Sequence, residues 1–251
     1  MLRARWNLER SHRAMSSLWR PIALVSGGVL LCVAVASPLG ALDHQLLTAH
    51  MAKHLLLMTV AAPLILLGTP VVALRPVLAR LAQNHAGRWF GDAITHPVFC
   101  WFAATAVVIG WHIPSAFELG MRSASWHRVE SVSFLAAGLL FWWPVIQPGP
   151  SWRTPLYLFL ATLPCDALSA FLVFCDRVVY PHYKFAGNRF DLSPLGDQEW
   201  AGALMWVWVT FAYLAPAAGV AMHLLSSRQT DRVRTTSVSQ TAKLPSPSRS
   251  R

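Results

Sequence analysis

The sequence predicts an all-α membrane protein: a polytopic helix bundle with six transmembrane helices and both termini in the cytoplasm. Its 251 residues are 55% hydrophobic and only 13% charged, which is untypical of a soluble domain. Apolar stretches of about 20 residues, the length that a helix needs to cross a bilayer, recur along the chain. Arginine and lysine gather in alternate segments between these stretches, which indicates the orientation of the bundle.

Each expected span is a long apolar run with few formal charges. The first, residues 21–40, follows a basic N-terminal arm of residues 1–20. The others are residues 46–68, 97–117, 131–147, 155–175 and 201–225. Residues 21–225 therefore form the predicted transmembrane domain, and the polar, basic residues 226–251 form a predicted disordered tail. We expect the first span to be a retained anchor, with a cleaved signal peptide as the alternative.

The net charge of +10 indicates topology rather than a nucleic-acid partner. Arginines concentrate in the N-terminal arm, in the tail, and in the loop after the second span as Arg75, Arg80 and Arg88. Cytoplasmic loops of membrane proteins carry an excess of Lys and Arg, so we expect these segments in the cytoplasm. The expected surroundings are a lipid bilayer.

Two histidines and a methionine share one face at the start of the second span. His50, His54 and Met58 recur at every fourth position, which places them on one side of a helix. Imidazole and thioether ligands favour Cu(I), whereas hard cations prefer carboxylates. We expect the neighbouring Lys53 to extend outward to the lipid headgroups. The alternative is that both histidines only form hydrogen bonds with neighbouring helices.

Further polar residues fall at the predicted outer ends of the spans, where the histidines are His44, His50, His54, His112, His127 and His182. Asp166 differs because it lies near the middle of the fifth span, where a bare carboxylate is costly. It is expected to face inward, either bonding to a neighbouring helix or serving a proton or metal relay. The four cysteines form no CxxC pair, so we expect them to serve as small buried hydrophobic residues: Cys32, Cys100, Cys165 and Cys175.

Five motifs follow one another from the second span onward: HMAKHLLLMTVAAPLILLGTP, WHIP, WHRVESVSFLAAGLLFWWPV, DRVVYPHY and LSPLGDQEWAGALMWV. Together they resemble the CtaG-type cytochrome c oxidase assembly proteins, over about residues 46–225. The resemblance implies a multi-pass protein of the bacterial plasma membrane that is needed to make active haem–copper oxidase. It also implies cytochrome c oxidase subunits as partners and copper delivery as the role.

The resemblance extends to individual polar positions, which are His50, His54, His112, His127, Asp176, Asp197, Gln198 and Met205. Combined with the histidine ladder, it gives a predicted copper site for Cu(I), made of His50, His54, Met58, His112, His127, Asp197 and Met205. Two positions depart from the family pattern. Ser131 stands where a histidine is expected, and Lys53 stands where an uncharged polar residue is expected.

Two other functions remain open from the sequence. One is a metal-free chaperone or scaffold for an oxidase subunit, since small residues let transmembrane helices pack closely. The other is a haem protein that pairs His54 with His112. An enzyme is not expected, because the sequence contains no nucleophile–base pair or cofactor motif. If the topology is right, His50, His54, His112 and Met205 cluster on the outer side and face the bundle interior.

Overall fold

All regular structure in the described residues is helical. The structure, a computed structural model, describes residues 2–36, 42–69, 91, 95–147, 151–185 and 192–242. Its elements are α1 (Leu2–Ala36), α3 (Leu47–Leu55), η1 (Leu56–Ala61), α4 (Ala62–Gly68), α7 (Pro97–His112), α8 (Pro114–Arg122), α9 (Ala124–Ile146), α10 (Arg153–Phe174), α11 (His182–Phe185) and α12 (Pro194–Ala242). The predicted all-α class is confirmed.

Five helical segments are long and apolar enough to cross a membrane: Leu18–Val35, Leu47–Gly68, Ala124–Ile146, Arg153–Phe174 and Pro194–Ser227. Helices α7 and α8 make a sixth if they are counted as one span, bent by 75°. The bend falls at Ile113, whose extended backbone is the conformation that a following proline, Pro114, favours. The polytopic helix bundle is therefore confirmed, with its third span broken near one end.

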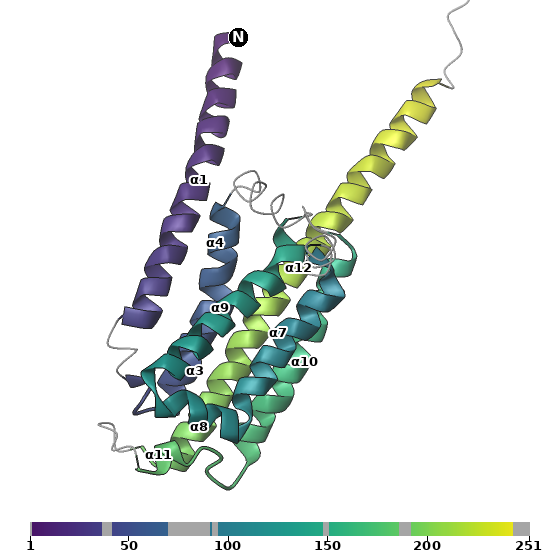
Figure 1. The fold of residues 1–251 in the computed structure, drawn as a ribbon. Helices are drawn as coiled ribbons and strands as arrows, with labels where there is room; N and C mark the ends of the chain where they lie inside the picture. Colours follow the sequence, from purple (N-terminus) through teal and green to yellow (C-terminus); the bar gives the residue numbers. More distant parts are fainter. Residues whose placement is uncertain are drawn as a thin grey trace, which may run out of the picture.

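The two ends of the bundle differ, as Figure 1 shows. The N-terminal end of α1 and the C-terminal end of α12 lie at the same end, while α8 and α11 lie at the other. An even number of crossings requires this arrangement of the termini. The assignment of their side to the cytoplasm stays a prediction, because Arg75, Arg80 and Arg88, on which it partly depends, lie outside the described residues.

Two helices extend beyond their predicted limits. Helix α9 begins at Ala124 rather than at residue 131, because the Ser123 side chain caps it by accepting a hydrogen bond from the Trp126 N–H. Helix α12 continues to Ala242, so residues 226–242 are helical where the sequence predicts a disordered tail. No proline or glycine interrupts that stretch. The last part of the predicted tail, residues 243–251, lies outside the described residues.

The second span is built from α3, η1 and α4, and its middle part, η1, is a π-helix. Helix α9 approaches this part closely, since a Cβ atom on Gly138 would lie 2.7 Å from the Met58 carbonyl oxygen. The indole N–H of Trp142, also on α9, donates to that same carbonyl at 3.1 Å. Short π-helical turns inside α-helices often occur at functional sites, and this one directly follows the helix that carries the paired histidines.

Candidate metal centre

Two histidines of α3 and a glutamate of α9 meet in the interior. His50 Nε2 lies 3.2 Å from Glu130 Oε1, and His54 Nε2 lies 3.0 Å from His50 Nε2. All three side chains are buried. The histidines reach α9 together because residues four apart share one side of a helix. One ligand atom from each residue lies within 4.8 Å of the others, so the group could hold a single metal ion.

Glu130 controls where the protons of these imidazoles sit. An ionised carboxylate only accepts hydrogen bonds, so His50 Nε2 donates to it and His50 Nδ1 keeps a lone pair. His54 Nε2 lies 3.4 Å from the same carboxylate oxygen. The Nδ1 atoms of both histidines are buried and have no hydrogen-bond partner among the described residues. Such an unpaired nitrogen costs about 1–3 kcal/mol, which a bound ligand would offset.

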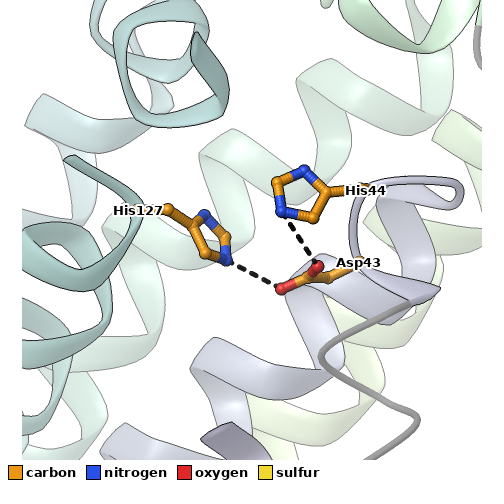
Figure 2. A group of neighbouring side chains, drawn as sticks. All are labelled: Asp43, His44 and His127. Carbon is orange, nitrogen blue, oxygen red and sulfur yellow. Dashed lines mark hydrogen bonds and ion pairs between the residues drawn. The ribbon is translucent and has the colours of Figure 1, made fainter. Parts of the chain in front are cut away.

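A second group, Asp43, His44 and His127, lies beside the first (Figure 2). Both imidazoles face the carboxylate of Asp43, with His127 Nε2 2.9 Å from Oδ2 and His44 Nε2 3.9 Å from Oδ1. His127 joins the two groups, because its Nδ1 lies 3.3 Å from Glu130 Oε2. A continuous chain of polar side chains thus links the exposed His44 to the buried His50 and His54.

Lys53 also belongs to this second group, so the prediction that it extends to the headgroups is wrong. Its ammonium contacts Asp43 Oδ2 and His127 Nε2, and its side chain is only 3% exposed. The physical reason is the buried Asp43 carboxylate. A buried charge without a partner is strongly destabilising, and pairing with Asp43 outweighs the loss of hydration of the ammonium. Burial alone would raise the pKa of Asp43. Hydrogen bonds from His127 and Lys53 outweigh that effect and hold the pKa well below its ordinary range.

A small cavity of about 30 Å³ lies next to His54. The side chains that line it include four predicted metal ligands, His54, Met58, His112 and Met205, and two further sulfur-bearing residues, Met51 and Cys165. His50 does not line the cavity but contacts His54, with 3.0 Å between their Nε2 atoms. The predicted clustering of His50, His54, His112 and Met205 in the bundle interior is therefore present in the structure.

His112 ends α7 at the break before Pro114. Its Nδ1 lies 2.7 Å from the Val108 carbonyl oxygen and therefore donates to it, which leaves the lone pair on Nε2. Nε2 is buried and has no hydrogen-bond partner in the described part of the chain. The His112 carbonyl, at the broken end of the helix, accepts a hydrogen bond from the Tyr180 hydroxyl at 3.1 Å. The break thus fixes a histidine with an unprotonated nitrogen at the wall of the cavity.

Asp197 and Gln198, at the start of α12, use their side chains to hold backbone groups. Asp197 accepts hydrogen bonds from the N–H groups of Leu47 at 2.6 Å and Thr48 at 3.1 Å, at the N-terminus of α3. Gln198 accepts from the Val179 N–H at 2.7 Å. Neither side chain is among those that line the cavity. A role of Asp197 as a metal ligand stays a prediction.

The other polar and sulfur-bearing residues singled out in the sequence, Asp166, Asp176 and the cysteines, differ in their burial. Asp166 is half-buried in α10, and its Oδ1 atom has no hydrogen-bond partner among the described residues. None of the four cysteines forms a disulfide bond among the described residues. The expected burial holds for Cys100 and Cys165 but is wrong for Cys32, which is exposed on α1. Asp176 is exposed after the end of α10.

Sequence reasoning did not identify Asp43 and Glu130 as members of the site. Glu130 follows His127 at a spacing of i,i+3 on one helix, and this spacing is a usable signal for a side-chain pair. Asp43 lies in the turn before α3, ten residues from Lys53. No periodic pattern connects a turn residue to a helix face, so its pairing depends on the fold.

Most of the chain matches a known family. The chain matches the family model of the cytochrome c oxidase caa3 assembly factor (Caa3_CtaG) over residues 2–227. The chain belongs to this family. The resemblance predicted from the five motifs is thereby confirmed, and the match covers α1 as well as the spans from which the motifs were read.

Three mycobacterial relatives are similar to this family member. Uncharacterized proteins of Mycobacterium bovis and Mycobacterium tuberculosis are each 27% identical to it over 208 residues, which is 74% of this chain and 31% of theirs. One of Mycobacterium leprae is 26% identical over 208 residues. The chain thus spans about a third of the length of these curated relatives. No solved structure matches it.

Proposed function

We propose that this protein binds Cu(I) as cargo in the bundle interior and passes it to a haem–copper oxidase during assembly, in the bacterial plasma membrane. Membership of the caa3 oxidase assembly-factor family supports the assembly role. The role is non-catalytic: the protein holds and transfers an ion and makes no covalent bond. The partners are oxidase subunits, which approach the end of the bundle where α8 and α11 lie.

The observation that carries the proposal is the pair of unpartnered nitrogens at the cavity. His54 Nδ1 and His112 Nε2 belong to side chains that line it, and neither has a hydrogen-bond partner among the described residues. The thioethers of Met58 and Met205 line the same cavity. Buried imidazole nitrogens in an otherwise apolar wall need a ligand. An ion bound there would satisfy both of them.

The donor set favours Cu(I) over other ions. Imidazole and thioether are soft ligands that suit Cu(I), while Mg²⁺, Ca²⁺ and Mn²⁺ prefer carboxylate and water oxygens. A cavity of about 30 Å³ has room for one small ion or one water. Glu130 supports the site without lining the cavity, because it orients His50 and His54 through their Nε2 atoms.

A Cu(I) titration of the detergent-purified protein against a competing chelator tests the proposal. We expect the parent to bind one ion, and His54→Ala/His112→Ala to bind it at least about tenfold more weakly, about 1.4 kcal/mol. His223→Ala, at an exposed position of α12, is the matched control. If the double variant is folded and binds Cu(I) as tightly as the parent, the site is wrong.

A metal-free scaffold is the second candidate, and one observation favours it. Five polar side chains from three segments of the chain already form hydrogen bonds or ion pairs with one another without an ion: Asp43, His50, Lys53, His127 and Glu130. Copper supplementation of a deletion strain separates the two functions. Partial recovery of oxidase activity indicates metal delivery, whereas a scaffold predicts none.

A further inference from the structure

The Asp43 group contains the donors that a divalent metal ion prefers. Asp43, His44 and His127 each offer one ligand atom, and these atoms lie within 4.8 Å of one another (Figure 2). Two imidazoles and a carboxylate are a common ligand set for Zn²⁺ and related divalent ions. Asp43 is fully buried, while His44 is exposed. Its donor atoms and the exposure of His44 to the surroundings make the group resemble a metal site that an ion could reach from the surface.

The ammonium of Lys53 lies where such an ion would sit. Lys53 Nζ is 2.5 Å from Asp43 Oδ2 and 2.5 Å from His127 Nε2, and so contacts two of the three residues of the group. An ammonium only donates hydrogen bonds, so its contact with Asp43 engages an oxygen lone pair that a metal ion would need, and its contact with His127 occupies the space beside the imidazole nitrogen. A divalent ion would also meet the positive charge of Lys53 at contact distance.

The surroundings of Lys53 keep it in this position. The Tyr183 hydroxyl of α11 donates to the Asp43 carbonyl at 2.6 Å, which fixes the turn that carries the carboxylate. Glu130 lies on the other side of His127, 3.3 Å from its Nδ1. Withdrawal of the ammonium would leave the Asp43 carboxylate buried without its cation, which is strongly unfavourable. Lys53 is therefore not a side chain that an arriving ion displaces easily.

We propose that Lys53 is a permanent internal cation that closes the Asp43–His44–His127 group to divalent metal ions. The group is then a fixed ion pair at the edge of the polar cluster. It turns away ions that prefer nitrogen and oxygen ligands, such as Zn²⁺, Co²⁺ and Ni²⁺. Lys53 is thus a specificity-determining residue, and this inference does not depend on which ion the inner cavity binds.

A Co²⁺ titration of the full-length protein in detergent, followed by visible absorption and by competition with Zn²⁺, tests this assignment. Lys53→Met keeps the length and apolar stem of the side chain but removes the charge. We expect this variant to gain one equivalent of bound Co²⁺ over the parent. Lys53→Arg, which keeps a cation, should show no gain. Lys53→Met/Asp43→Asn, which removes the carboxylate, should lose the gained equivalent.

Two results would overturn the assignment. One is a folded Lys53→Met variant that binds no more Co²⁺ than the parent. The other is a parent protein that already binds Co²⁺ in a manner abolished by Asp43→Asn, since the group would then be open despite Lys53. Lys53→Gln supplies the same measurement if the methionine variant does not fold. A Lys53→Met variant that folds only when Zn²⁺ is present supports the assignment.

Discussion

Asp197 of α12 caps the N-terminus of α3 by accepting a hydrogen bond from the Leu47 N–H at 2.6 Å. The same carboxylate accepts from the Thr48 N–H at 3.1 Å and from the Thr48 hydroxyl at 2.7 Å. The residue at the N-cap position, Leu46, supplies no side-chain hydrogen bond. A carboxylate from the last span therefore replaces the local cap. Its negative charge also interacts favourably with the positive end of the α3 helix dipole.

Asp197→Ala should lower the stability of the protein by about 1–2 kcal/mol, the usual effect of losing a helix cap. Thermal unfolding in detergent measures the loss, with Asp176→Ala at an exposed position as the control. Loss of a helix cap lowers the stability of the fold, whereas loss of a metal ligand lowers the affinity for the ion. If Asp197→Ala abolishes Cu(I) binding while leaving the unfolding temperature unchanged, Asp197 is a ligand and the cap is unimportant.

Gly138→Ala should destabilise the bundle, because its new Cβ would lie 2.7 Å from the Met58 carbonyl oxygen and 2.8 Å from the Ala62 Cβ. The neighbouring atoms are backbone and a short side chain, so α9 must move away from η1. Gly110→Ala is the control, since nothing lies within 4 Å of a Cβ there, and alanine suits a helix better than glycine. Equal unfolding temperatures for the two variants would show that α9 does not pack tightly on η1.

The spans were predictable because they depend on composition alone. The bilayer requires long apolar runs, and residues 46–68 and 155–175 were placed to within about two residues of Leu47–Gly68 and Arg153–Phe174. The pairing of His50 with His54 was also predictable, because spacing fixes which residues share a helix face. These parts of the prediction needed no knowledge of how the helices pack.

Pairings between helices were not predictable in the same way. Lys53 reads as a surface lysine until the fold brings the Asp43 turn against it, and nothing in the sequence indicates that Asp197 also holds the start of α3. The π-helical turn of η1 also leaves no periodic signal in the sequence. In each case the decisive partner comes from a different segment, and hydropathy carries no information about that choice.

The orientation of the bundle gives a further prediction. With both termini in the cytoplasm, GFP fused at either end should fluoresce, and alkaline phosphatase fused there should be inactive. Alkaline phosphatase inserted after Arg122, between α8 and α9, should be active, because that end of the bundle faces outward. The opposite pattern of reporter activities would place the histidine cluster on the cytoplasmic side.

Glu130→Gln should weaken Cu(I) binding about tenfold, the lower end of the usual effect of losing a group that orients a metal ligand. The amide keeps the size of the side chain but is neutral, so it holds the His50 and His54 imidazoles less firmly. Ser131→Ala is the neighbouring control, because the Ser131 hydroxyl donates to the His127 backbone carbonyl and, among the described residues, has no hydrogen bond to a histidine side chain. An unchanged Cu(I) affinity in a folded Glu130→Gln protein would show that Glu130 does not support the site.

The depressed pKa of Asp43 predicts how its contribution to stability depends on pH. The pKa lies well below its ordinary value of 3.8, so the folded protein holds the carboxylate ionised where the unfolded chain would protonate it. The stabilisation is therefore fully present above about pH 5 and declines as the pH falls below about 4. The difference in unfolding temperature between the parent and Asp43→Asn should be large at pH 5.5 and smaller at pH 3. A difference that grows on acidification would mean that the Lys53–Asp43 pair does not stabilise the fold.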